Sequence, residues 1–289
     1  MAVQEVRASG LDYLARATQL LQRVRLADAE AGQWEAADLQ WWWRTPRPSD
    51  AVEQLFWVDD DGPVAGVILT DWGRAWGCDP IVVPMTSAVT LPTIWNRALE
   101  TVDDLGLEAV ETLVRDDDVE LARLVTASGF MPSGKRDGVT WMDAEDRLEV
   151  AALPEGFVLR DRSQEKTGPH PMRARSGEAV AARLAQCSLY DPELDLCVRT
   201  ADGQVAGYAL FWFDPVTSVG LVEPMRVEDA FQRRGLARAM LTEGLDRLAR
   251  RGARRLKVGY ATDAARALYV GSGFRPSATS RAYTWRRPG

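Results

Sequence analysis

The chain repeats itself, and this internal repeat constrains its fold more than any other feature. The segment DGPVAGVIL at residues 61–69 returns as DGQVAGYAL at residues 202–210, an offset of 141 residues. The segment SGFMPS from Ser128 returns as SGFRPS from Ser272, and a Thr-Trp pair follows each at the same distance. Ordered matches with a nearly constant offset indicate two copies of one fold, each of about 140 residues.

Each copy is expected to be an α/β domain. In the second copy, a DG turn separates two apolar strands within 194–213, and a strand at 219–227 leads into a helical pattern at 234–251. This order of elements predicts a mixed sheet with helices on its faces. We place the two domains at residues 1–147 and 153–289.

The charges are divided unevenly between the copies. Residues 1–150 hold 13 Lys and Arg against 27 Asp and Glu, whereas residues 151–289 hold 22 against 15. The basic copy suits a compact polyanion such as a nucleotide cofactor. The acidic copy argues against nucleic acid as a partner of the whole chain. An equal alternative is that the opposite charges only help the two copies to dock.

Composition excludes several other classes of protein. No apolar run reaches the roughly 18 residues of a membrane span, and residues 1–10 lack the blocks of a signal peptide, so we expect a cytoplasmic protein without a membrane partner. Cys78, Cys187 and Cys197 have neither disulfide nor zinc spacing, and we expect them to be small buried side chains. The single histidine, His170, is expected on a surface loop, which leaves proton transfer to carboxylates and tyrosines.

The loop before the helical pattern carries the strongest functional signal. Its residues are Gln232, Arg233, Arg234, Gly235, Leu236, Ala237 and Arg238. Backbone N–H groups at a helix N-terminus lack intrahelical partners, and the helix dipole adds about half a positive charge there. A phosphate therefore suits this turn. Gly235 and the small Ala237 let a phosphate approach the backbone, and the arginines add positive charge.

This loop resembles the acetyl-CoA loop of the GNAT N-acetyltransferase superfamily, Gln/Arg-x-x-Gly-x-Gly/Ala, at Gln232, Gly235 and Ala237. Residues 261–274, ATDAARALYVGSGF, are similar to the second signature of that superfamily, with Thr262 where the family usually has Asn. The resemblance implies two tandem GNAT-like domains, each a mixed, mostly antiparallel sheet flanked by helices. In length and in its intact C-terminal copy, the chain resembles mycothiol synthase.

The first copy lacks the phosphate loop. Residues 85–99, MTSAVTLPTIWNRAL, contain no glycine and no basic cluster. Leu124-Val125 stand where the second copy has Leu268-Tyr269. We therefore predict a degenerate first domain and an acetyl-CoA-binding second domain.

The resemblance also implies roles for residues of the second copy. Met225 and Val227 lie on the strand that the family splays to bind the pantetheine arm and the carbonyl group, with Val227 as the N–H donor. Tyr269 occupies the position of the acid that protonates the thiolate, and a phenol with a pKa near 10 is neutral at pH 7. Glu223 is the candidate base. It lies four residues before Val227, so the period of two predicts that both side chains share one face.

Structural roles are the alternatives for these side chains. Tyr269 is otherwise a core residue of a helix, and Glu223 an ion-pair partner. Trp212 and Tyr190 either line the acceptor pocket or, as we favour, pack in the core. Arg233 and its neighbours are otherwise a solvated helix start.

We therefore expect an N-acetyltransferase that uses acetyl-CoA as a co-substrate and acetylates a primary amine of a small molecule by direct attack on the thioester. The alternative is a catalytically inactive acetyl-CoA-binding regulatory or interaction module. We expect no metal, and a monomer rather than a homodimer. The tryptophan-rich first copy either packs in core and interdomain surfaces or attracts a cationic amine with the acidic runs at Asp59 and Asp116.

Overall fold

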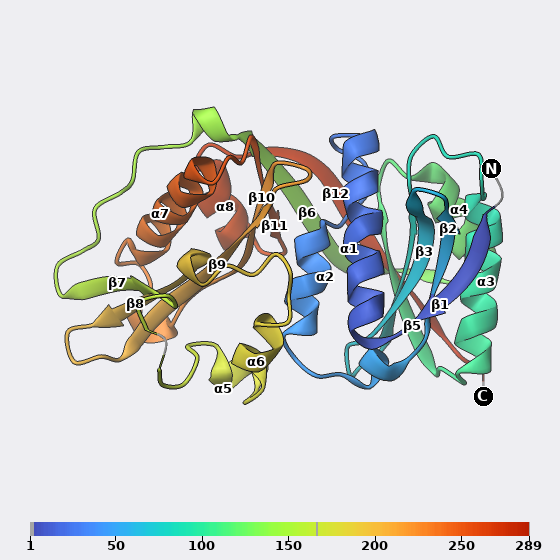
Figure 1. Ribbon diagram of the computed structural model, residues 1–289, viewed down its shortest axis with the longest axis horizontal. Coiled ribbons are helices and arrows are strands. Elements are labelled where there is room, and N and C mark those ends of the chain that lie inside the picture. The colour runs from blue at the N-terminus through green and yellow to red at the C-terminus, as the bar shows by residue number, and fades with distance from the viewer. Residues whose placement is uncertain (1–2, 166, 289) are drawn as a thin grey trace. The chain divides into compact units, whose positions relative to one another are not determined.

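The computed structural model describes residues 3–165 and 167–288, which form two compact units (Figure 1). Both units consist of a mixed sheet with flanking helices, so the predicted fold class is confirmed. Unit 1 comprises Met1–Leu39, Pro46–Asp137 and Ala278–Gly289, and unit 2 comprises Gln40–Thr45 and Gly138–Ser277. Among the residues just given, no helix is long and apolar enough to cross a membrane.

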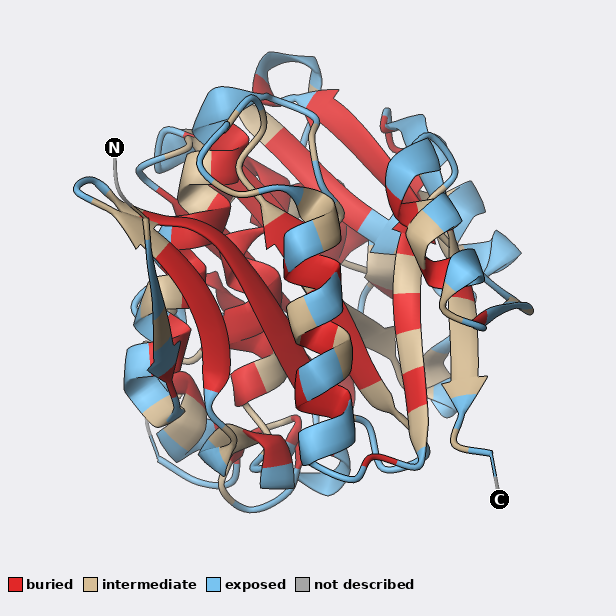
Figure 2. Cartoon of the chain, turned by 90° about the vertical axis from the view of Figure 1, so that its right-hand side faces the viewer, coloured by how far each residue is buried: buried red, intermediate tan, exposed pale blue. Residues whose placement is uncertain are grey.

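The sheet of unit 1 is antiparallel except for one parallel pair, β4 with β5. In spatial order its strands are β1 (Gln4–Ala8), β2 (Gln54–Asp59), β3 (Gly62–Asp71), β4 (Trp76–Val82), β5 (Ala109–Arg115) and β12 (Arg275–Arg286). Its helices are α1 (Gly10–Ala27), α3 (Leu91–Asp104) and α4 (Val119–Ala127). Figure 2 shows the strands largely buried, beside helices whose outer faces are exposed.

The sheet of unit 2 follows the same plan, with β10 and β11 as its parallel pair. In spatial order its strands are β6 (Met131–Asp143), β11 (Arg255–Tyr260), β10 (Val219–Val227), β9 (Val205–Asp214), β8 (Asp195–Thr200) and β7 (Phe157–Asp161). Its helices are α5 (Arg173–Ser176), α6 (Val180–Leu184), α7 (Leu236–Arg250) and α8 (Asp263–Val270). The apolar face of α7 packs in the core of this unit through Leu236, Met240, Leu241, Leu245 and Leu248, which recur at helical spacing.

Each unit is completed by the last strand of the other sequence copy. β12 ends the second copy, yet its residues 280–286 pair with β5 in unit 1. β6 ends the first copy, and its residues 138–143 pair with β11 in unit 2. The compact units therefore do not coincide with the domains placed at residues 1–147 and 153–289, because each unit contains residues of both. A repeat records the order of similar segments along the chain and carries no information on which strand pairs with which.

Part of the tryptophan-rich segment also belongs to unit 2. α2 (Ala36–Trp43) contributes its last four residues to that unit. The indole N–H of Trp43 donates a hydrogen bond to the Gln186 side chain (2.8 Å), and the Arg183 guanidinium lies 3.4 Å from the centre of the Trp43 ring. Trp41 and Trp43 are both buried. Packing, rather than an open aromatic surface, is therefore the role of these two tryptophans.

The prediction for the cysteines is confirmed, because Cys78, Cys187 and Cys197 are free thiols and buried. Burial raises the pKa of the Cys187 and Cys197 thiols to about 12, so both are protonated at neutral pH.

The prediction that His170 lies on a surface loop is wrong. Its side chain is buried, and Nε2 lies 2.8 Å from a carboxylate oxygen of Asp195. Nδ1 accepts a hydrogen bond from the Met172 N–H (3.2 Å), so the ring proton belongs on Nε2 and is donated to Asp195. The Tyr190 hydroxyl donates to the same carboxylate oxygen (2.8 Å). The carboxylate partner 25 residues away compensates for burial of the imidazole.

Candidate active site

β10 and β11 separate part-way along their length. They pair in parallel where Val219–Val222 lie opposite Arg255–Val258, and from there β10 continues along β9 alone to Val227. The separation begins at the cis peptide bond between Glu223 and Pro224. Because proline has no N–H, Pro224 cannot donate a hydrogen bond to β11. We call the stretch beyond Val222 and Val258, where the recorded pairing of these two strands ends, the strand gap.

The edge of β10 that faces this gap presents main-chain groups. The Glu228 N–H donates to the Ala206 carbonyl oxygen on β9 (2.9 Å). Hydrogen-bonded positions alternate along an antiparallel ladder, so the N–H groups of Val227 and Met225 point away from β9, toward the gap. Val227 and Met225 are the two strand residues singled out from the sequence, and their backbone groups converge on this gap.

Two residues that sequence reasoning missed shape this strand. A Cβ on Gly207 of β9 would lie 2.8 Å from the Arg226 carbonyl oxygen, so only glycine allows β9 to pass so close to β10. Pro224 ends the pairing with β11. A glycine or proline inside an apolar strand is the signal that would have identified both positions.

Trp212 holds the irregular part of β10 in place. It is fully buried, and its indole N–H donates to the Glu223 carbonyl oxygen (2.7 Å). Its ring packs edge-on against Tyr190, with ring centroids 6.3 Å apart. Trp212 therefore belongs to the core, and its contact with the site is through the backbone of Glu223.

The prediction that Glu223 and Val227 share one face is wrong. Between Val222 and Met225, β10 advances three residues while β9 advances two, which is a β-bulge. Val222, Met225 and Val227 all pack toward the core under α7. Since neighbouring residues alternate before the bulge, Glu223 points to the face opposite Val222, and the extra residue breaks the period of two.

The N-terminus of α7 is open. Gly235 is its N-cap, with φ of 84°, and no side chain forms a capping hydrogen bond there. Arg233 also has a positive φ, of 65°. Arg233 and Gly235 are therefore both in the left-handed region, with Arg234 between them. In such a conformation successive N–H groups can converge on one anion. The first-turn N–H groups of α7 add the positive end of the helix dipole.

The side chains of this loop are arranged around that N-terminus. Leu236 is buried and anchors the helix, whereas Gln232, Arg233, Arg234 and Arg238 are exposed, and Ala237 is half-buried. The Gln232 amide donates to the Val227 carbonyl oxygen (3.4 Å) and to the Asp229 carboxylate (3.1 Å). The loop before α7 is thereby tied to the end of β10, so this loop and the strand gap are adjoining parts of unit 2.

Tyr269 lies in α8 and is only 7% exposed. Its ring packs edge-on against Phe274, with centroids 6.1 Å apart. Burial, and secondarily the Glu223 carboxylate, raise the pKa of Tyr269 above its ordinary value near 10. The phenol is therefore neutral at pH 7 and carries a proton that it can donate.

Thr262 is the N-cap of α8. Its hydroxyl accepts a hydrogen bond from the Ala265 N–H (3.2 Å). Thr and Asn are both favourable N-caps, which accounts for Thr at this position without any ligand contact.

In unit 1, the helix that corresponds to α7 has a capped N-terminus. α3 has Thr90 as N-cap, and the Thr90 hydroxyl accepts from the Thr93 N–H (3.4 Å). Pro92 removes one more first-turn N–H group. The start of α3 therefore offers an anion fewer donors than the start of α7.

Similarity to known proteins agrees with this geometry. Residues 159–274 match the acetyltransferase (GNAT) family. No curated protein matches the chain in sequence. Within the described ranges, no group of three or more His, Cys, Asp or Glu side chains could hold a metal ion.

Solved structures resemble the chain over nearly its whole length. A tandem GNAT protein from the clavulanic acid biosynthesis pathway is 17% identical with a TM-score of 0.68, covering 99% of both chains. A GCN5-related N-acetyltransferase from Sphaerobacter thermophilus is 18% identical with a TM-score of 0.63, covering 99% of this chain and 96% of the other. A GCN5-related N-acetyltransferase from Kribbella flavida is 17% identical with a TM-score of 0.54, covering 92% and 96%. At these identities the likeness describes the fold.

Proposed function

We propose that the chain is a tandem member of the GNAT acetyltransferase superfamily and that it transfers an acetyl group from acetyl-CoA to a primary amine of a small molecule. One observation carries the proposal. In unit 2 the open N-terminus of α7 adjoins a strand edge whose backbone groups face a gap. A phosphate-bearing arm and a carbonyl group need these two features side by side.

The residues present fit acetyl-CoA. The backbone N–H groups from Gly235 to Arg238, with Arg233 and Arg234, would hold its phosphates. Met225 and Val227 would hold the pantetheine arm through their backbone groups. Gln232, Leu236 and Ala237 shape the loop, and Thr262 contributes to the site by starting α8. Acetyl-CoA itself supplies a thioester whose carbonyl carbon can accept an amine.

The side chains divide the proton transfers between them. Glu223 takes a proton from the ammonium form of the acceptor, directly or through water, because only the neutral amine is a nucleophile. The amine nitrogen then forms a bond to the carbonyl carbon, the C–S bond breaks, and the Val227 N–H stabilises the developing negative charge on oxygen. Tyr269 gives its proton to the thiolate. Of the two protons that the nitrogen loses, one leaves through Glu223 to solvent and the other restores Tyr269.

Calorimetric titration of acetyl-CoA tests the cofactor and the loop together. The variants are Gly235→Glu and, as a matched control, Gly203→Glu. Both glycines are exposed with positive φ, 84° and 88°, and no atom lies within 3.4 Å of a Cβ added at either position. The two substitutions therefore introduce similar backbone strain, but only the first places a carboxylate at the start of α7.

We expect the wild type and Gly203→Glu to bind one equivalent of acetyl-CoA and Gly235→Glu to bind none. Binding by Gly235→Glu with wild-type affinity would remove the loop from the site. No binding by any of the three proteins would contradict the proposal, and two equivalents would show that unit 1 also binds the cofactor.

A further inference from the structure

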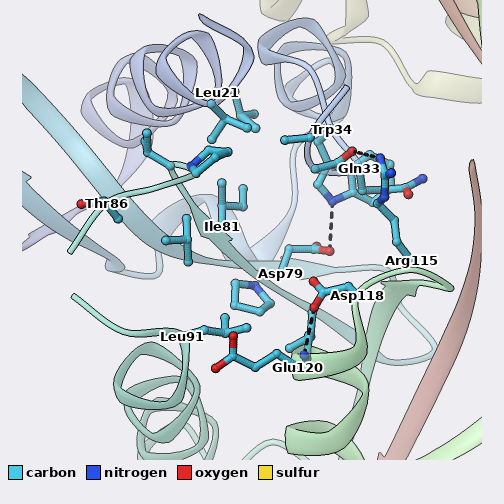
Figure 3. Close-up of a pocket in the computed structure, with 18 of the residues that line it drawn as sticks. Leu21, Gln33, Trp34, Asp79, Ile81, Thr86, Leu91, Arg115, Asp118 and Glu120 are labelled. Atoms are coloured by element: carbon cyan, nitrogen blue, oxygen red, sulfur yellow. Dashed lines mark hydrogen bonds between the residues drawn. The ribbon is translucent and has the colours of Figure 1, made fainter. Parts of the chain in front are cut away.

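Unit 1 contains a cavity of about 510 Å³ where its own parallel strands part (Figure 3). β4 and β5 pair at Trp76 and Gly77, and the cavity lies beside residues 79–86. Its volume falls in the range of small-molecule sites. The first copy therefore keeps a gap between its parallel strands although its helix start is capped.

One side of the cavity is apolar. Leu21 and Val24 reach it from α1, and Ile81 reaches it from β4. Leu21, Val24 and Ile81 are each less than 10% exposed. A ligand in this cavity needs an apolar body to match this side.

The opposite side is acidic. Figure 3 shows Asp79, Asp118 and Glu120 along one side of the cavity, across from Leu21. The Asp79 side chain is buried, and one of its oxygens accepts a hydrogen bond from the Trp34 indole N–H (3.1 Å). The Asp118 carboxylate caps α4 by accepting from the Leu121 N–H (3.0 Å).

The cation that lines the cavity is already paired. Arg115 donates to the carbonyl oxygens of Glu30 (2.7 Å) and Gly32 (3.0 Å) and binds the Asp117 carboxylate through two hydrogen bonds (2.9 and 2.6 Å). The described lining residues include no other Lys or Arg. The lining therefore presents net negative charge to a ligand, which favours a cation and disfavours a phosphate.

We propose that this cavity binds a small organic ammonium ion, with its apolar body against Leu21 and Ile81 and its ammonium group at Asp79. The site belongs to unit 1 alone and does not depend on acetyl transfer in unit 2. A carboxylate in an apolar enclosure is stabilised by an ammonium partner that both compensates its charge and donates hydrogen bonds.

The affinity should depend on pH in a defined direction. Burial raises the pKa of Asp79 to about 7, while the Trp34 hydrogen bond and Lys135 lower it and Glu111 raises it. The Tyr13 phenol also lies near Asp79, and its own pKa is raised by burial. Between pH 6 and pH 8, Asp79 loses its proton while an alkylammonium keeps its own. Ammonium binding should therefore strengthen over this range.

Three probes with one common body test the proposal in the full chain without acetyl-CoA: 2-phenylethylamine, 2-phenylethanol and phenylacetate. Calorimetry should show that the amine binds about tenfold more tightly than the alcohol, because one charge-assisted hydrogen bond accounts for a difference in affinity of this size. Phenylacetate should not bind. In Asp79→Asn, the amine should lose this preference while the alcohol binds as before. Asp104→Asn, an exposed carboxylate on α3, is the control and should match the wild type.

Several outcomes would overturn the proposal. Equal affinity for all three probes, no binding of the amine, or an unchanged preference in Asp79→Asn would each do so. If Asp79→Asn does not fold, Glu120→Gln replaces an exposed carboxylate of the lining and should weaken amine binding about twofold to threefold. No change in that variant would also overturn it. Gly235→Glu should bind the amine normally, which separates this site from the cofactor proposal.

Discussion

Burial determines the protonation states of individual residues in this chain. The phenol of Tyr269 and the carboxyl of Asp79 lie in apolar surroundings, and burial is the largest cause of the raised pKa of each. Tyr269 therefore stays a neutral acid at pH 7, whereas Asp79 titrates near neutrality. The residue types were readable from the sequence, but their protonation states follow from the atoms packed around them.

Replacing Tyr269 with Phe tests its role as the acid. We expect kcat to fall about 10²- to 10³-fold, because the thiolate loses its proton donor, while affinity for acetyl-CoA stays the same. Steady-state rates with an acceptor amine and calorimetry with acetyl-CoA measure the two effects. An unchanged kcat would assign Tyr269 to packing against Phe274, and a loss of cofactor affinity would point to damage to α8.

At the scale of elements, the proposed function depends on where regular structure stops. β10 is an ordinary strand up to Val222, then bulges at Glu223, and its remaining edge faces the gap. The strand and the helix after it were predicted from hydrophobic periodicity, with α7 predicted at 234–251 and found at Leu236–Arg250. The bulge was not predicted, because it depends on the pairing with β9 and on the Trp212 hydrogen bond.

Trp212→Phe should separate the bulge from general stability. The change keeps a buried ring but leaves the Glu223 carbonyl without its indole donor, at a cost of about 1–3 kcal/mol in the free energy of unfolding. Trp95→Phe is the matched control, because Trp95 is also fully buried and donates to the Ser128 hydroxyl (2.9 Å) in unit 1.

Urea unfolding and kcat should be measured for both variants. Both should lose stability to a similar extent, and Trp212→Phe alone should lose activity. Equal activities in the two variants would mean that the position of the Glu223 backbone does not matter for transfer.

At the scale of the whole molecule, the exchange of last strands makes the two copies interdependent. β12 completes the sheet of unit 1 through residues 280–286, and β6 completes the sheet of unit 2 through residues 138–143. A chain cut at the sequence boundary would leave both sheets with an unpaired edge.

Fragments 1–147 and 153–289 should therefore not fold separately. We expect each to lack a cooperative thermal transition by circular dichroism, and a mixture of both to recover acetyl-CoA binding. The full chain is the positive control. Acetyl-CoA binding by isolated 153–289 with the affinity of the full chain would show that the strand from the first copy is dispensable.

Three carboxylates in the acidic runs of the first copy are held in ion pairs. Arg23 binds Asp59 (2.8 Å), and this ion pair holds the pKa of Asp59 below its ordinary value. Asp116 pairs with Arg136, and Asp117 with Arg115. The idea that these runs attract an amine over long range loses support, and the buried Asp79 becomes the better candidate for meeting one.

The sequence by itself determined the features that depend on neighbouring residues. The repeat, the type and order of the elements, the glycine at the start of α7 and the buried cysteines were all readable, because local spacing and composition decide them. Only the tertiary structure decided the features that depend on distant partners. His170 is buried because Asp195 accepts a hydrogen bond from its ring. Glu223 leaves the alternation because β10 bulges where it pairs with β9, and the sheets exchange strands because strand pairing depends on residues far apart in the sequence.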